Sequence, residues 1–109
     1  INTLKNKYKL KTSAELNRAG HKQFPKNKNV FMAKDNKQIK QIWDDITEGA
    51  EAIKDGINKK TGEIIPMRRL SDGTILKLRK KSDSKGSTIE IGNKGERKIH
   101  NKAGEDGDW

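Results

Sequence analysis

The sequence reads TILKLRK at residues 74–80, STIEI at residues 87–91 and RKIHN at residues 97–101. Apolar and polar residues alternate in each segment, which is typical of a strand that buries one face. Because successive side chains of a strand point to opposite faces, one face should be aliphatic and the other polar. The predicted aliphatic face holds Leu76, Leu78, Ile89, Ile91 and Ile99. The predicted polar face holds Lys77, Arg79, Thr88, Glu90, Lys98 and His100.

Turn signals separate these strands and add another before them. Ser71-Asp72-Gly73 predicts a tight hairpin turn, and residues 92–95 predict a second one. Residues 58–62 predict a turn, followed by a strand from Glu63 to Leu70 in which Pro66 marks an edge or a bulge. The region from residue 63 to residue 101 therefore predicts a meander of about four strands.

Two helices are expected before this meander. Thr12 with Glu15 fits a capping box that opens a short helix through about Ala19, which Gly20 would end. Residues 24–31 should then form a loop.

Asp35 with Gln38 forms a second capping box. Behind it, apolar residues recur at helical spacing: Ile39, Ile42, Trp43, Ile46, Ala50 and Ile53. Gly49 is placed to break or kink this helix and Gly56 to stop it, and Trp43 is expected in the core. The predicted fold class is therefore α+β, with N-terminal helices packed on one face of a twisted, about four-stranded antiparallel sheet. The opposite, polar face would then be left open.

Length and charge limit the alternatives. The 109 residues suit a single domain, 1–109, with a modest core. Residues 1–11 form a basic N-terminal segment, and residues 103–109 form an acidic tail that we expect to be flexible. A net charge of +10 points to a polyanionic partner, such as nucleic acid, an anionic membrane or an acidic protein.

Other classes of protein are disfavoured by composition. No apolar run approaches the roughly 18 residues that a membrane span needs, so no membrane insertion is expected. The chain has no cysteine and only two histidines, so we expect neither a metal site nor a cofactor. It begins at Ile1, which suggests that it was excised from a longer protein.

The polar face carries the groups that metal-free RNA cleavage requires. This reaction needs a base for the 2′-hydroxyl proton, an acid for the 5′-oxygen, and donors that stabilise the phosphorane. His100 and His21 could form the acid–base pair, with Glu90 as a substitute base, so the general base stays open among these three. Arg79 could hold the phosphate through two N–H donors, with the Thr88 hydroxyl adding a further contact.

The chain resembles a family of bacterial toxins in its order of elements. A Gly20-His21-Lys22 segment precedes a helix and a meander that ends in STIEI (87–91) and Lys98-Ile99-His100. This layout resembles the compact ribonuclease toxins of the barnase, EndoU, colicin E5/D and RelE-like superfamily. In particular, it resembles the C-terminal toxin domains of contact-dependent growth inhibition proteins.

The resemblance implies an endoribonuclease that is delivered from a cell surface and cleaves RNA, tRNA rather than rRNA, in the cytoplasm of a target bacterium. It implies an acidic cognate immunity protein as a partner and admits a host translation factor as another. By resemblance to colicin D, His21 beside Lys22 would be catalytic; by resemblance to barnase, Glu90, Arg79 and His100 would be. The expected RNA-binding residues are Lys22, Lys77, Lys85 and Lys98.

A second interpretation keeps the same residues without catalysis. Glu90 would then form a cross-strand ion pair with a neighbouring lysine or arginine. The lysines would contact phosphate in a basic RNA-binding module, which would lose affinity with salt instead of cutting RNA.

Overall fold

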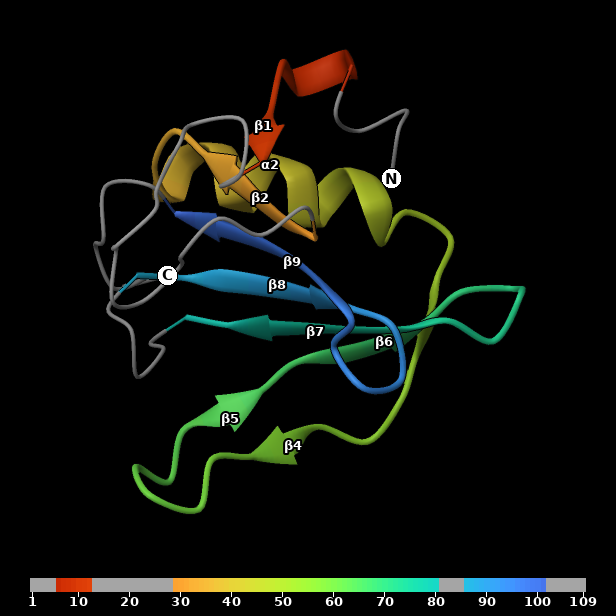
Figure 1. Cartoon of the computed structure of the whole chain (residues 1–109). Helices are drawn as coiled ribbons and strands as arrows, with labels where there is room; N and C mark the ends of the chain where they lie inside the picture. The colour runs from red at the N-terminus through yellow and green to blue at the C-terminus, as the bar shows by residue number, and fades with distance from the viewer. Residues whose placement is uncertain (1–5, 13–28, 81–85, 102–109) are drawn as a thin grey trace.

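A large, twisted sheet dominates the fold (Figure 1). The computed structural model describes residues 6–12, 29–80 and 86–101. Within these residues, seven strands form one sheet in the order β1-β2-β9-β8-β7-β6-β3, and two more form the hairpin β4-β5. The strands of the large sheet are β1 (Lys11–Thr12), β2 (Val30–Ala33), β3 (Glu51–Ala52), β6 (Met67–Arg69), β7 (Ile75–Arg79), β8 (Thr88–Ile91) and β9 (Arg97–Asn101). The hairpin consists of β4 (Gly56–Ile57) and β5 (Ile64–Ile65), and the helix α2 spans Asn36–Ile46.

The predicted fold class, with N-terminal helices on about four antiparallel strands, is wrong. The described part of the chain forms a mixed seven-stranded sheet with α2 and a single helical turn at residues 6–8. The difference arises mainly from β2, which pairs in parallel with β9 and carries β1 on its other side. All four residues of β2 are buried. A continuous apolar run is typical of a strand buried on both faces, and it lacks the alternation that reveals other strands.

The structure tests the predictions for the N-terminal region at only a few residues. Thr12, expected to open a helix, lies in β1 opposite Phe31 of β2. The rest of that predicted helix, through Ala19, lies outside the described residues. The predicted loop at residues 24–31 is wrong at Val30 and Phe31, which belong to β2, because their side chains are buried in the sheet.

Helix α2 begins as predicted but ends earlier. The Asp35 side chain caps it by accepting a hydrogen bond from the Gln38 N–H at 2.9 Å. The helix ends at Ile46, where the Thr47 hydroxyl donates to the Trp43 carbonyl oxygen at 2.6 Å. Gly49 then adopts a left-handed conformation, with φ of +75°. The chain turns into β3, so the prediction that the helix continues to Ile53 is wrong.

The predicted meander is present as part of the larger sheet. Strand β7 pairs antiparallel with β6 and β8, and β8 pairs antiparallel with β9. In the turn before β7, the Gly73 N–H donates a hydrogen bond to the Leu70 carbonyl oxygen. In the turn before β9, the Gly95 N–H donates to the Gly92 carbonyl oxygen.

The prediction of one strand from Glu63 to Leu70 is wrong, because the chain divides at Pro66, which has no N–H to donate. Strand β5 pairs with β4 in the hairpin, whereas β6 pairs with β7 and β3 in the large sheet.

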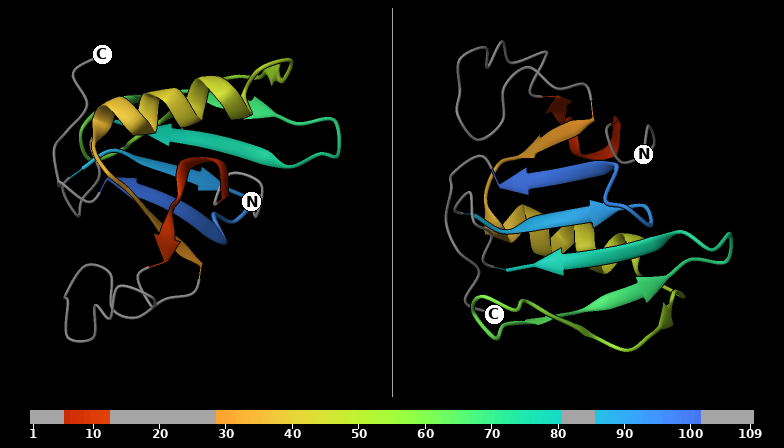
Figure 2. Two further views of the ribbon diagram at one scale, coloured as in Figure 1. Left: turned by 90° about the horizontal axis from the view of Figure 1, so that it is seen from above. Right: turned by 60° about the horizontal axis from the view of Figure 1, so that its bottom comes forward.

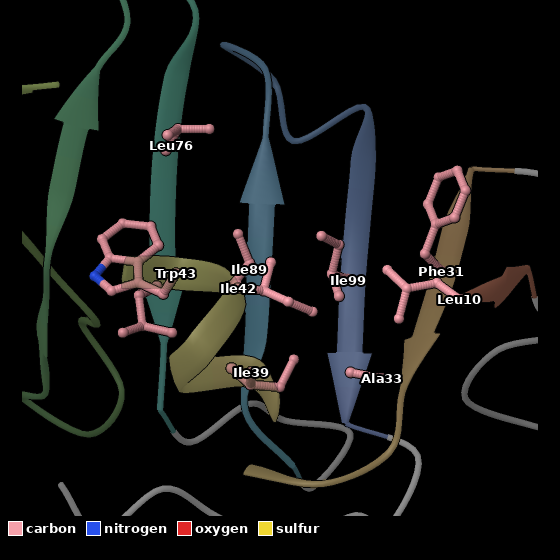
Figure 3. Close-up of a cluster of buried hydrophobic side chains, with 10 residues drawn as sticks. Leu10, Phe31, Ala33, Ile39, Ile42, Trp43, Leu76, Ile89 and Ile99 are labelled. Atoms are coloured by element: carbon pink, nitrogen blue, oxygen red, sulfur yellow. The ribbon is translucent and has the colours of Figure 1, made fainter. Parts of the chain in front are cut away.

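The core lies between α2 and one face of the sheet (Figure 3). Three buried helix side chains, Ile39, Ile42 and Trp43, face the strands. Their buried partners on the sheet are Leu76, Leu78, Ile89 and Ile99, with Phe31, Ala33 and Leu10 at the β2 side. Each fully buried aliphatic side chain contributes roughly 1.5–3 kcal/mol. This layer fixes the three central strands that carry the polar face.

Candidate active site

The polar residues predicted to share a face do so. The pairing of β7, β8 and β9 places Arg79, Thr88 and His100 in one row across the sheet. The next row holds Lys77, Glu90 and Lys98. In the right-hand view of Figure 2, α2 lies behind the strands, so these rows are on the side that the helix leaves uncovered. The two-residue period of the strands, which predicted this arrangement, is confirmed.

Arg79 and Glu90 form an ion pair across neighbouring rows. The Arg79 Nε–H donates to Glu90 Oε1 at 2.8 Å. The Glu90 side chain is only 13% exposed and that of Arg79 is 33% exposed, so water screens this pair less than a surface pair. The cross-strand ion pair expected for Glu90 is therefore present. It fixes a carboxylate beside a guanidinium in the middle of the face.

Thr88 and His100 form the second pair. The Thr88 hydroxyl lies 2.8 Å from His100 Nδ1, and both residues are buried, with exposed fractions of 3% and 2%. If the hydroxyl donates to Nδ1, the neutral imidazole carries its proton on Nε2. The hydrogen bond then fixes both the ring orientation and its tautomer.

The expectation of an open polar face is wrong at this end of the rows. Because β2 pairs with β9, Met32 continues the row of His100 and Val30 continues the row of Lys98. Met32 and Val30 are both 5% exposed. His100 thus lies on an inner strand with an apolar neighbour. The more exposed part of the site is formed by β7 and β8.

Two lysines flank the carboxylate. Lys77 lies opposite Glu90 on β7, and Lys98 lies opposite it on β9. Both lysines are partly exposed. With Arg79 they place three cations around one carboxylate. Such a group can bind a phosphate while keeping an oxygen base in the same place.

We call Arg79, Thr88, Glu90 and His100 the β7–β9 site, because these strands supply all four. Three of the predicted functional residues, His21, Lys22 and Lys85, lie outside the described residues. The contribution of His21 as an acid or base therefore stays a prediction.

A buried polar cluster beside the site was missed. The Ser87 hydroxyl and the Asn101 side-chain amide both donate to Asn36 Oδ1, the latter at 2.6 Å. Ser87 and Asn101 are fully buried. They tie the first turn of α2 to the ends of β8 and β9. Strand parity places both on the helix side of the sheet, and this signal could have separated Ser87 from its neighbour Thr88.

The described residues contain no group of three histidine, aspartate or glutamate side chains placed to hold a metal ion. No helix among them has the length and apolar character to cross a membrane. No family model, curated protein or solved structure matches the chain.

Proposed function

We propose that this chain is a metal-independent endoribonuclease. The observation that carries the proposal is the β7–β9 site, which groups a guanidinium, a hydroxyl, a carboxylate and an imidazole on one face of adjacent strands. The net charge of +10 supports a polyanionic substrate.

In this proposal Glu90 is the general base. Arg79 occupies Oε1 of the carboxylate, so Oε2 is the oxygen that takes the 2′-hydroxyl proton. The resulting 2′-oxygen attacks the adjacent phosphorus, and the bond from phosphorus to the 5′-oxygen breaks. Because DNA has no 2′-hydroxyl, this route selects RNA.

His100 is the proposed general acid. It lies diagonally across from Glu90, and diagonal neighbours of an antiparallel pair are roughly 7–8 Å apart. In this proposal the scissile phosphate lies between base and acid. In the protonated imidazole both ring nitrogens donate, so Nδ1 would donate to the Thr88 oxygen while Nε2 gives its proton to the leaving 5′-oxygen.

The cations stabilise the negative charge that develops on the phosphoryl oxygens of the phosphorane. The Arg79 guanidinium lies beside the carboxylate, so it can contact a phosphate oxygen while Glu90 accepts the proton. Lys77 and Lys98 lie on either side in the next row. They suit the flanking phosphates of the same strand.

The biological setting rests on the resemblance to bacterial toxins. In that setting the substrate is tRNA in the cytoplasm of a target bacterium, and an acidic immunity protein neutralises the enzyme. The positive charge of the chain supports an acidic partner because opposite charges steer association.

The burial of His100 supports a second candidate function. His100 is 2% exposed and hydrogen-bonded to Thr88, so it can stabilise the sheet without taking part in catalysis. The chain would then be a basic RNA-binding module in which Lys77, Arg79 and Lys98 contact phosphate. Such a module binds RNA with a strong dependence on salt but leaves it intact.

The test compares two glutamates that each pair with an arginine across strands. Glu90→Gln keeps the shape of the side chain but removes the proposed base, and we expect cleavage of purified tRNA to fall by about 10²–10⁴-fold. Glu51→Gln is the matched control, because Glu51 accepts from Arg69 at 2.8 Å on the exposed β3–β6 edge. The control should cleave like the unaltered chain.

The two outcomes separate the candidates. Loss of cleavage in Glu90→Gln alone, with RNA binding retained, supports the ribonuclease. An unaltered chain that binds tRNA and leaves it intact in the presence of a growing excess of protein supports the binding module and contradicts catalysis.

A further inference from the structure

The turn between β8 and β9 lies against the carboxylate of Glu90. This turn runs from Gly92 to Gly95, and the Gly95 N–H donates to the Gly92 carbonyl oxygen at 3.0 Å. Gly95 is buried and has a φ of +64°. A Cβ atom at this position would lie 3.1 Å from Glu90 Oε2 and 3.4 Å from its Cδ. The first distance is tighter than most Cβ contacts, and the second is at the lower limit of ordinary van der Waals contact.

The carboxylate cannot move away freely from such a methyl group. Its other oxygen, Oε1, is held by Arg79 at 2.8 Å, and the side chain is 13% exposed. A methyl group at residue 95 would therefore require the carboxylate to shift by a few tenths of an ångström, against its ion pair with Arg79. The contact falls on Oε2, the oxygen proposed to take the 2′-hydroxyl proton.

We infer that Gly95 is a positioning residue for the general base, an inference that rests on the proposed ribonuclease function. Glycine at this position lets the turn close while leaving Glu90 Oε2 in place. Gly95 does not act on the substrate itself. It acts through Glu90, so its replacement should lower kcat more than it changes KM.

Gly73 provides the matched control. It ends the turn between β6 and β7, its N–H donates to the carbonyl oxygen three residues earlier at 2.9 Å, and its φ is +91°. A Cβ at Gly73 would meet nothing within 4 Å. Gly73→Ala and Gly95→Ala thus impose the same kind of backbone strain, but only Gly95→Ala contacts the carboxylate.

The experiment measures kcat and KM for tRNA cleavage by the folded chain in both alanine variants, with and without Glu90→Asp. We expect Gly95→Ala to lower kcat on the order of 10²-fold, as a small misplacement of a reacting group does. Gly73→Ala should change kcat by less than about twofold, since its Cβ would meet no neighbouring atom within 4 Å. Glu90→Asp shortens the side chain by one methylene, so in its presence Gly95→Ala should cost less than about threefold, because the contact is gone.

Each outcome decides a different point. The inference about Gly95 is overturned, and the proposed function is not, if Gly95→Ala and Gly73→Ala lower kcat equally. The same holds if Gly95→Ala lowers kcat as much in the presence of Glu90→Asp as in its absence. An unaltered chain that does not cleave RNA overturns the proposed function, and the inference with it. If Gly95→Ala does not fold, restored folding in the double variant supports the contact. Failure of both variants to fold assigns the defect to the turn and overturns the inference.

Discussion

At the residue scale, Asp45 joins α2 to the N-terminal segment. Its Oδ2 accepts hydrogen bonds from Lys7 Nζ at 2.6 Å and from the Tyr8 hydroxyl at 2.7 Å. The bond from Lys7, followed by that from Tyr8, holds the pKa of Asp45 below its ordinary value. The charged form of Asp45 therefore favours the folded state.

We expect this contact to make stability depend on pH in a defined direction. A carboxyl whose pKa is lowered by folding stabilises the protein above its unfolded pKa of about 3.9, and that contribution is lost as pH falls through the folded value. Asp45→Asn should thus reduce the free energy of unfolding at pH 7 and make little difference near pH 2. Urea unfolding of both proteins at the two pH values checks this. A difference that is equal at both would contradict the role of the charge.

The hydrogen bond between Thr88 and His100 should matter for stability. Thr88→Val keeps the volume but leaves a buried imidazole nitrogen without its hydroxyl partner, which costs about 1–3 kcal/mol of unfolding free energy. Thr61→Val removes an exposed hydroxyl that accepts from the Glu63 N–H at 3.2 Å in the β4–β5 turn. Because water can replace that partner, this control should change stability by less than about 0.5 kcal/mol. Chemical denaturation gives both values. A small effect of Thr88→Val would mean that the bond contributes nothing to the fold.

At the element scale, the capping residue of α2 should determine how firmly the helix begins. Asp35→Ala removes the acceptor of the Gln38 N–H and should cost about 0.5–2 kcal/mol. Asp44→Ala, at an exposed position within α2, should cost less than about 0.5 kcal/mol. Equal values in thermal unfolding would show that α2 is held by its apolar face alone.

The sequence predicted elements well where the signal was local. The Asp35 cap, the turns at residues 71–73 and 92–95, and the faces of β7, β8 and β9 depend on residues close together in the chain. The end of α2 was missed because Ala50 and Ile53 keep the helical spacing beyond Thr47. The chain instead forms β3, which pairs with β6. A pattern of neighbouring residues does not predict this pairing.

At the scale of the whole molecule, the parallel pair of β2 and β9 was not predictable from spacing. It joins residues 30–33 to residues 98–101, far apart in the chain, and β2 has no alternation. This pair also decides the environment of His100, since it makes β9 an inner strand. Strand parity could therefore place Arg79, Glu90 and His100 on one face, but it could not predict that His100 is buried.

The chemistry of the RNA ends tests the central claim most directly. The purified chain is incubated with tRNA in EDTA, and the 3′ ends of the fragments are identified. Attack by the 2′-hydroxyl, with Glu90 as base and His100 as acid, predicts discrete fragments that end in a 2′,3′-cyclic phosphate. Intact tRNA, or fragments that end in a free 3′-hydroxyl, would contradict the claim that the β7–β9 site cleaves RNA in this way.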